Sequence, residues 1–508
     1  MKTRNIFALV ASLLFSITCA GCGGSGGGAP ASGAVSSFSQ GVVTAKGSIT
    51  VGGVKFDTDN VSAVTMDDNA SKGVNDLKVG MMVRVKGKID DATKTGVAEK
   101  IEFADNLEGT IETKGVDTLI VFGQTVKVNN ETIIEESSTG RILFENLSVS
   151  ERIEVSGVPD NTGAIRATRI ERKNGATEDM EIKGTVSDFA GTGDTMITLT
   201  PPNGAPLTVD IGGTIAPPVP TPVPTPVPEN IRAAALPAGF GNGSFVEVKT
   251  KASGSTITAT SVEMEVEMEA AENERMEVEG FVTILSAADK TFKVGNVTVS
   301  AGALPLPDNG AEVEVHGMMN KDGALVASEI EVEKECEIEL EGRVAATADI
   351  DLAGKTLKLN GITVVTTNKT MFKDSDNTGG KTPLETFELR HINVDDQIEV
   401  VGIQSAATGK IVAVKIERKV KPLDLLKQMK IQGPVTAVNA AGNTFTLLEG
   451  ITVDITGINP ARVKDITGAP LLPAVFFSRL VLNQTVAVAE GTLSGTVLTA
   501  VEVQIKGP

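Results

Sequence analysis

Apolar and polar residues alternate with a period of two along most of this chain. The run 83–87 reads Val-Arg-Val-Lys-Gly, and related runs occupy 153–157, 313–317 and 398–402. A half-buried strand has this period, because successive side chains point to opposite faces of a sheet. Tight turns such as Asp322-Gly323 separate the runs. The pattern therefore predicts an all-β chain made of antiparallel hairpins.

The strand pattern also repeats at a longer interval. Each copy opens on Gly-x-Val or Gly-x-Ile, at Gly41, Gly109, Gly184, Gly280, Gly342 and Gly433. Each copy closes on Ala-x-x-Ile or Ala-x-x-Val, starting at Ala98, Ala167, Ala259, Ala327, Ala413 and Ala500. Because the two markers agree, we expect about six tandem copies of five or six short strands.

Side-chain parity within a copy predicts how its strands curve. Ile338 and Leu340 share their parity with Gly342, and a core-facing glycine allows a strand to coil sharply. In the closing motif 165–170, Ile170 departs from the parity of the apolar residues before it, which predicts a β-bulge. We therefore expect small closed antiparallel β-barrels of the OB-like type.

The same markers set the expected domain boundaries. We expect a signal peptide at 1–21, a tether at 22–37, and copies at 38–105, 106–175, 176–270, 271–335, 336–420 and 421–508. Glu fills every odd position from Glu329 to Glu341, so one strand pattern runs from the fourth copy into the fifth. A semi-rigid rod of barrels is therefore expected. The best helical candidate is 422–429.

A proline-rich run at 217–228 falls inside the third copy. Its alternating Val-Pro-Thr-Pro sequence favours a stiff, extended polyproline loop that projects from the barrel. A docking ligand for an aromatic-lined partner is the alternative.

The N-terminus has the layout of a secretory signal. Lys2 and Arg4 precede an apolar run at 6–17 that is too short to cross a bilayer. Ala20-Gly21-Cys22 resembles the lipobox of bacterial lipoproteins, which implies a lipid on Cys22, although Cys19 stands where that motif usually has Leu. Cleavage near Ala20 without lipidation is the alternative. We expect an exported, membrane-anchored lipoprotein of the cell outer membrane, facing the periplasm or the cell surface.

Composition excludes several classes of function. The formal net charge is −19 and Trp and Tyr are absent, so the chain repels phosphate backbones and lacks the usual stacking platforms for bases. Nucleic acid is therefore not an expected partner. The sequence has two histidines, His316 and His391, and shows no phosphate-binding loop, zinc spacing or nucleophile motif. An enzyme is not expected.

Local alternation also predicts the surroundings of single side chains. His316 alternates with Val313 and Val315, so it should face solvent. Cys336 shares the parity of Ile338, which predicts a buried and inert thiol.

One loop has a partial calcium-binding pattern. Asp374, Asp376, Thr378 and Glu385 occupy the first, third, fifth and twelfth positions of an EF-hand loop. Thr378 replaces the usual Asp or Asn, Pro383 interrupts the loop, and the flanks read as strand rather than helix. Calcium is therefore the candidate cofactor, with a polar hairpin loop as the alternative.

Glutamates also recur along one face of two predicted strands, at 263–269 and 329–341. Such carboxylates lie about 7 Å apart along a strand, and their repulsion is eased by divalent cations or neighbouring lysines. Solvated strands that resist edge-to-edge aggregation are the expected purpose, and low-affinity cation binding is the alternative.

Taken in order, the motifs Gly-x-Val, Gly-Ile-x-Val, Val-Glu-Val-x-Gly and Ala-x-x-Ile-Glu resemble a bacterial domain of unknown function, DUF5666, found as tandem repeats in exported lipoproteins. The resemblance covers nearly the whole mature chain, and the third and sixth copies depart from it most. It implies no site residues. We expect a non-enzymatic, lipid-anchored envelope scaffold that presents loops to a protein, polysaccharide or matrix. A divalent-cation or small-ligand binding module that uses acidic strand faces is the alternative.

Overall fold

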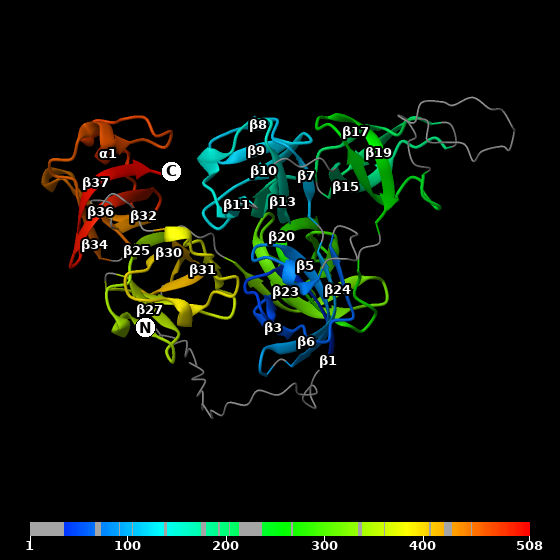
Figure 1. Cartoon of the computed structure of the whole chain (residues 1–508), viewed down its shortest axis with the longest axis horizontal. Coiled ribbons are helices and arrows are strands. Elements are labelled where there is room, and N and C mark those ends of the chain that lie inside the picture. The colour runs from blue at the N-terminus through cyan, green and yellow to red at the C-terminus, as the bar shows by residue number, and fades with distance from the viewer. Residues whose placement is uncertain are drawn as a thin grey trace, which may run out of the picture.

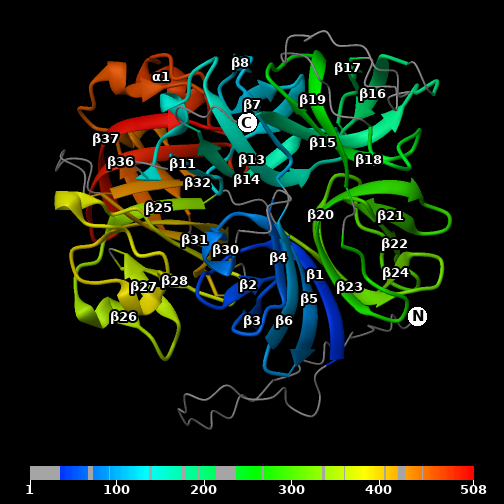
Figure 2. The same ribbon diagram turned by 45° about the vertical axis from the view of Figure 1, so that its right-hand side comes forward.

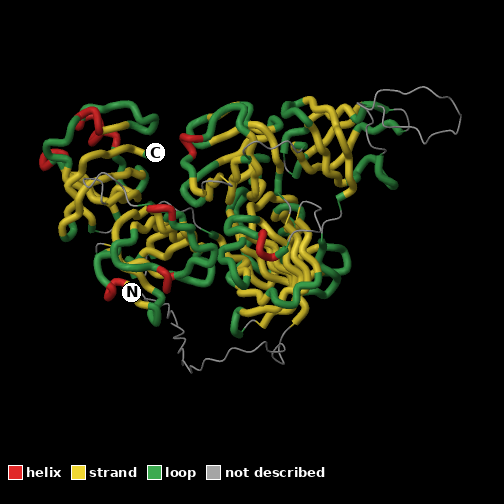
Figure 3. The backbone as a smooth tube through the Cα atoms, in the orientation of Figure 1, coloured by secondary structure: helices red, strands yellow, loops and turns green. Residues whose placement is uncertain are grey.

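The computed structural model describes residues 35–507 apart from 67–72, 91, 104, 137–139, 174–178, 192–193, 203, 213–235, 266–267, 334–337, 360, 406–407, 421–428 and 449. The regular secondary structure of these residues is almost entirely β-strand, with loops and turns between the strands, which confirms the mostly β prediction (Figure 3). The one α-helix in this part of the chain is α1 (Pro473–Arg479). No described helix has the length and apolar character needed to cross a membrane.

Three five-stranded barrels close on themselves. The first contains β15 (Met180–Ser187), β16 (Met196–Thr200), β17 (Leu207–Asp210), β18 (Phe245–Thr250) and β19 (Thr256–Met264). The second contains β20 (Arg275–Ser286), β21 (Thr291–Val294), β22 (Val297–Ser300), β23 (Glu312–Met319) and β24 (Ala324–Val332). The third contains β32 (Met429–Asn439), β33 (Thr444–Leu447), β34 (Ile451–Asp454), β36 (Val486–Ser494) and β37 (Val497–Ile505).

In each barrel the first strand pairs antiparallel with both the second and the fourth strand, which completes the ring. The third and fifth strands pair in parallel, so the barrels are not purely antiparallel as predicted.

Additional strands extend each barrel into a larger sheet. The second barrel is extended by β1 (Val35–Val42), β2 (Ile49–Val51), β3 (Val54–Asp57), β4 (Ala63–Met66), β5 (Met82–Asp90) and β6 (Thr95–Phe103). The first is extended by β7 (Leu107–Thr110), β8 (Thr113–Lys114), β9 (Thr118–Val121), β10 (Gln124–Lys127), β11 (Ile133–Glu136), β12 (Gly140–Arg141), β13 (Arg152–Pro159) and β14 (Ile165–Arg172). The third is extended by β25 (Ile338–Arg343), β26 (Ile350–Asp351), β27 (Thr356–Leu359), β28 (Ile362–Val365), β29 (Met371–Asp374), β30 (Gln397–Gln404) and β31 (Ile411–Lys419), and a short β35 (Val463–Lys464) pairs with β37.

The prediction of about six closed barrels in a rod is therefore wrong. Three rings close among the described residues, and β1 pairs in parallel with β20, far from it in sequence. The blue strands of 35–103 accordingly lie against the green strands of 275–332 (Figure 1 and Figure 2). An edge strand exposes unpaired N–H and C=O groups, so β1 can add to any accessible edge, whatever the distance along the chain.

The join between β1 and the second barrel is also a packing contact. Phe38 of β1 is fully buried in the core that contains Val278, Phe292 and Val315 of the second barrel. Ser36 Oγ donates a hydrogen bond of 2.8 Å to Glu274, which is 238 residues away in sequence. One barrel core is therefore completed by a strand from a remote part of the chain.

The predicted bulge and core-facing glycine are confirmed. Ser156 pairs with Arg169 whereas Gly157 pairs with Ala167, so Thr168 is the extra residue of the bulge. The same register shift opposite glycine occurs between β5 and β6, β23 and β24, β30 and β31, and β36 and β37. A Cβ on Gly157 would lie 2.2 Å from the Arg166 carbonyl oxygen, so a side chain cannot be accommodated there. Gly342 is buried beside Leu340.

Several sequence predictions concern residues that the structure does not describe. Three of them lie outside the described residues: Cys22, Cys336 and the proline-rich run 217–228. Residues 422–428 of the helical candidate lie outside them as well, and its last residue, Met429, begins β32. The strand predicted from Glu329 to Glu341 is described as β24, which ends at Val332, and β25, which begins at Ile338. Helix α1, which buries Phe476 and Phe477 in the third barrel, was not predicted.

Gly157→Ala should destabilise the chain by on the order of 2 kcal/mol, because its methyl group clashes with backbone rather than with a movable side chain. Gly73→Ala is the matched control, since Gly73 has an extended backbone and open space at its Cβ. Chemical denaturation of both variants checks this. Equal midpoints for Gly157→Ala and the original chain would contradict the bulge geometry.

Candidate functional site

The strand register places three glutamates side by side on adjacent strands. Glu279 of β20 pairs with Glu314 of β23, which pairs with Glu331 of β24. Paired residues project from the same face of a sheet, and like charges directly opposite one another are destabilising. These three residues, called the central triplet below, need neutralising charge.

Two equivalent triplets occur elsewhere and are well neutralised. One is Glu108, Glu154 and Glu171 on β7, β13 and β14, and the other is Glu341, Glu399 and Glu417 on β25, β30 and β31. Ion pairs of the first join Arg152 to Glu108, Lys173 to Glu154, and Lys78 and Arg169 to Glu171. Ion pairs of the second join Lys419 to Glu341 and Glu399, and Lys415 and Arg141 to both Glu399 and Glu417.

The cations around the second triplet lower the pKa of Glu399. Burial alone would raise its pKa, but Lys419, Lys415 and Arg141 outweigh burial and hold the pKa well below its usual value. The positive charges come from β12 and β31, so the second triplet is balanced across two sheets. Three glutamates share three cations there, and the face is occupied by its own side chains.

The central triplet instead opens on a cavity of about 510 Å³, called the acidic cavity below. Its wall contains six carboxylates and four basic side chains: Glu131, Glu279, Glu312, Glu314, Glu331 and Glu333, and Lys94, Arg166, Lys369 and Lys415. All three sheets line it, through strands of the second barrel, the turn Gly52–Gly53, Arg166–Thr168 of β14, Thr367–Lys369, and Val412–Lys415 of β31. The side chain of Glu314 is 4 % exposed whereas that of Glu331 is 47 % exposed. Glu314 therefore lies at the base of the cavity and Glu331 lies nearer solvent.

One ammonium group serves three of these carboxylates. Lys369 Nζ lies 2.5 Å from Glu314, 3.0 Å from Glu331 and 3.3 Å from Glu333. Glu279 and Glu312 have no ion pair within 4 Å among the residues that the structure describes. Negative charge therefore exceeds positive charge on this face, in contrast to the other two triplets.

The excess charge changes the ionisation of two carboxyl groups. Burial, followed by the negative charge of Glu314, raises the pKa of Glu279 to about 7. Burial and the charge of Glu279 raise the pKa of Glu312 to about 8. The surroundings of both groups therefore disfavour their charged forms at neutral pH.

A buried histidine adjoins the base of the acidic cavity. His316 Nε2 lies 2.8 Å from Glu314 Oε1, and Nδ1 lies 4.0 Å from Glu277 Oε2. The residue is 7 % exposed, so the prediction that His316 faces solvent is wrong. The local alternation was correctly identified, but the outer face of this barrel is covered by β1 and the Gly52–Gly53 turn. His391 lies at the end of a 3₁₀ helix (Leu389–His391) between β29 and β30, where its ring stacks on Phe387.

The predicted calcium loop uses most of its side chains in local contacts. Asp374 is buried and forms an ion pair with Arg418, and its Oδ2 accepts a hydrogen bond from the Leu384 N–H. Asp376 accepts hydrogen bonds from Thr378, while Glu385 forms an ion pair of 2.8 Å with Lys46. Calcium binding by these four residues stays a prediction.

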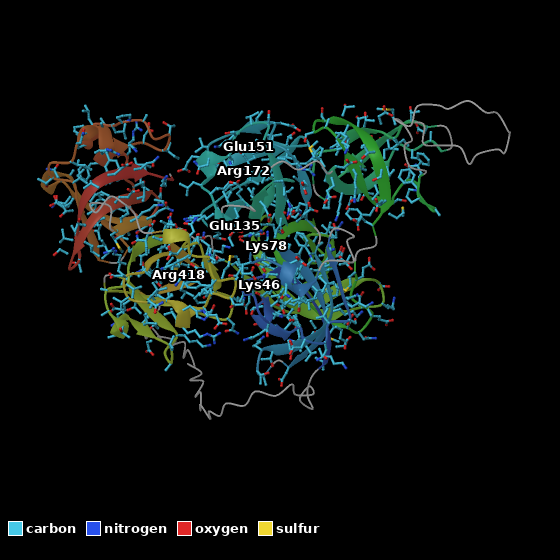
Figure 4. The ribbon with its side chains drawn as sticks, viewed as in Figure 1. Lys46, Lys78, Glu135, Glu151, Arg172 and Arg418 are labelled. Atoms are coloured by element: carbon cyan, nitrogen blue, oxygen red, sulfur yellow. The ribbon has the colours of Figure 1, made fainter. Side chains whose placement is uncertain are left out.

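Glu385 and Asp374 line a second cavity, of about 470 Å³, whose charged side chains pair with one another. Lys46, Lys78 and Glu135 lie close together there, where strands of 35–103, 107–172 and 338–419 meet (Figure 4). Burial would raise the pKa of Glu135, but Arg169 and Lys373 lower it to about 2. Several carboxylates of this cavity each have their own cation, since Glu135 pairs with Arg169, Glu171 with Lys78 and Glu385 with Lys46.

The triplets were not predicted, although the sequence motifs that contain their glutamates are present in the chain. Each triplet combines the Glu before an opening Gly-x-Val or Gly-x-Ile, the Glu of Ile/Val-Glu-Val, and the Glu that ends Ala-x-x-Ile-Glu. Aligning these motifs on neighbouring strands would have brought them together. Their difference in charge balance could not be found, because Lys369, Lys78 and Arg141 come from distant segments.

The raised pKa values predict how stability depends on pH. Between the unfolded pKa of 4.5 and folded values of about 7 and 8, the folded chain binds more protons at Glu279 and Glu312. The free energy of unfolding should therefore fall as pH rises from 5 to 8.5, by about 3 kcal/mol for each group. Glu135 and Glu399, whose pKa values are lowered, titrate below this window.

Urea denaturation in chelator-treated buffer at each pH measures this dependence. Glu312→Gln should flatten the fall, and Glu263→Gln, a half-exposed glutamate on β19, should leave it unchanged. A free energy that rises over the window would contradict the assignment.

Comparison with known protein families finds a match in the segments that contain all three triplets. Residues 32–102, 108–171, 279–331 and 341–417, together just over half of the chain, match the family described as Domain of unknown function (DUF5666). The nine triplet glutamates all lie in these segments, whereas six matching copies were expected. Among curated proteins, none matches the chain. The chain therefore belongs to the DUF5666 family, whose domain it repeats four times.

Proposed function

We propose that this chain is a non-enzymatic module that binds a divalent cation in the acidic cavity. The observation that carries the proposal is the contrast between three glutamate triplets, of which two are neutralised by their own cations while the central triplet shares one lysine. A doubly charged ion supplies the missing positive charge without further change in the fold.

The ligand set favours a hard cation such as Ca²⁺. The cavity is lined by the carboxylates of Glu131, Glu279, Glu312, Glu314, Glu331 and Glu333, and by the polar residues Thr367 and Asn368. Calcium takes six to eight oxygen ligands in flexible geometry, whereas Mg²⁺ demands a near-octahedral set. A cavity of about 510 Å³ also leaves room for water ligands.

Lys369 acts as the internal competitor of the ion. Burial opposes its charge, but Glu314 and Glu331 outweigh burial and raise its pKa, so the ammonium stays charged. Its side chain is 42 % exposed and belongs to a loop before β29, which allows it to move away when a cation enters.

The location and anchoring of the module form a further part of the proposal. A lipid on Cys22 would tether it to the outer membrane, where the barrels could also present loops to an envelope protein or polysaccharide. Support comes from the signal-like sequence 1–22 and its lipobox resemblance. Incorporation of labelled fatty acid that is lost in Cys22→Ala tests the anchor.

Glu331→Gln should weaken calcium binding by about tenfold, since it removes one charged ligand while leaving the fold unchanged. Glu263→Gln is a closely matched control, because Glu263 occupies the equivalent register position in the first barrel and its side chain is 48 % exposed against 47 % for Glu331. Isothermal titration calorimetry at pH 7.5 compares the two variants. Equal affinities, or an original chain that binds no Ca²⁺ or Mg²⁺, would overturn the proposal.

Lys369→Gln should instead strengthen calcium binding several-fold, because the competing ammonium is removed and the carboxylates remain. The same titration measures this gain, with Lys381→Gln, an exposed lysine beside Asp376, as the control. A loss of affinity in Lys369→Gln would show that the lysine holds the carboxylates in place for another purpose.

A further inference from the structure

A second ligand set lies beneath the acidic cavity. One atom each from Glu277, Glu314 and His316 lies within 4.8 Å of the others, and all three residues are buried. They come from neighbouring positions on β20 and β23, where Glu277 pairs directly with His316. The backbone ladder therefore holds the three side chains on one face without help from a loop.

One carboxylate oxygen of Glu277 has no hydrogen-bond partner. Its Oε1 is buried and has no hydrogen-bond partner, although the residue is 6 % exposed. The neighbouring Ser39, which pairs with Glu277 in the β1–β20 ladder and is 1 % exposed, has an unpartnered Oγ as well. Both residues and His316 line one narrow crevice. A buried polar group without a partner costs on the order of 1–3 kcal/mol, so a ligand that satisfied both groups would recover this free energy.

We infer that Glu277, Glu314 and His316 bind a first-row transition metal ion such as Zn²⁺. This site adjoins the acidic cavity and shares Glu314 with it, because Glu314 Oε1 faces His316 whereas Oε2 faces Lys369. Imidazole nitrogen favours zinc and its neighbours in the series, whereas Ca²⁺ and Mg²⁺ favour oxygen. Two carboxylates and one imidazole form a three-ligand set that zinc completes with water or a hydroxyl group, and Ser39 supplies a hydroxyl group in the same crevice.

The geometry requires a modest contraction. Zinc binds nitrogen and oxygen at about 2.0–2.2 Å, so ligand atoms in a tetrahedral site lie about 3.4 Å apart. The three atoms here lie within 4.8 Å of one another, and rotation of the two glutamate side chains can close this gap.

The site lies where the strands of 35–103 contact the second barrel. Glu277 is covered by the turn at Gly52, since a Cβ there would overlap its Oε1, and Ser39 belongs to β1. A metal at this point would bind the strands of 35–103 to the second barrel. Binding to the folded chain alone should therefore raise the unfolding temperature with the logarithm of the metal concentration once that concentration exceeds Kd.

Equilibrium dialysis of the full chain against Zn²⁺, in the presence of millimolar Ca²⁺ to fill the acidic cavity, tests the inference. We expect one zinc per chain, and at least tenfold weaker binding in His316→Asn and Glu277→Gln. His391→Asn is the matched control, because His391 is the other histidine of the sequence and should leave binding unchanged. Co²⁺ in place of Zn²⁺ should give a visible absorption band that His316→Asn abolishes.

The outcomes separate this inference from the proposed function. Zinc uptake that depends on His316, without calcium binding, supports the inference and removes the calcium proposal. Zinc uptake that is equal in the original chain, His316→Asn and Glu277→Gln, or no uptake at all, overturns the inference whether or not Ca²⁺ binds. Glu277→Gln, which keeps the shape of the side chain, decides the matter where His316→Asn fails to fold.

Discussion

The pairing of like-charged side chains across adjacent strands is the constraint on which this molecule depends. The register that closes a barrel also places glutamates opposite one another, as at Glu279 and Glu314, and their repulsion must be offset. Two triplets are offset by lysines and arginines. The central triplet has fewer ion-paired lysines and arginines than the other two. This excess of negative charge distinguishes it as a candidate cation site.

The offsetting charges also explain how the three sheets hold together. Lys78 reaches Glu171, Arg141 reaches Glu417 and Lys369 reaches Glu314, and each pair joins segments of different sheets. Removing one partner of such a buried pair leaves an uncompensated charge, which is strongly destabilising. Side chains that neutralise a triplet thus also fix how its sheet docks, and the acidic cavity lies where the three sheets meet.

Local features of this fold could be predicted from the sequence, and distant ones could not. Alternation and the Gly and Ala markers predicted the strands and the bulge at Thr168, because both depend on neighbours a few residues away. Pairing of β1 with β20 was not predictable, since an edge strand has the same pattern whichever edge it joins. The burial of His316 was missed for the same reason, because its cover comes from β1 and the Gly52 turn.

The most direct test of the account is anomalous diffraction from crystals grown with Mn²⁺, an ion that accepts both oxygen and nitrogen ligands. The account predicts an anomalous peak among Glu279, Glu314 and Glu331, and no peak at Glu108, Glu154 and Glu171 or at Glu341, Glu399 and Glu417. A peak at either neutralised triplet, or none at the central triplet, would contradict the claim that charge balance determines which face binds an ion.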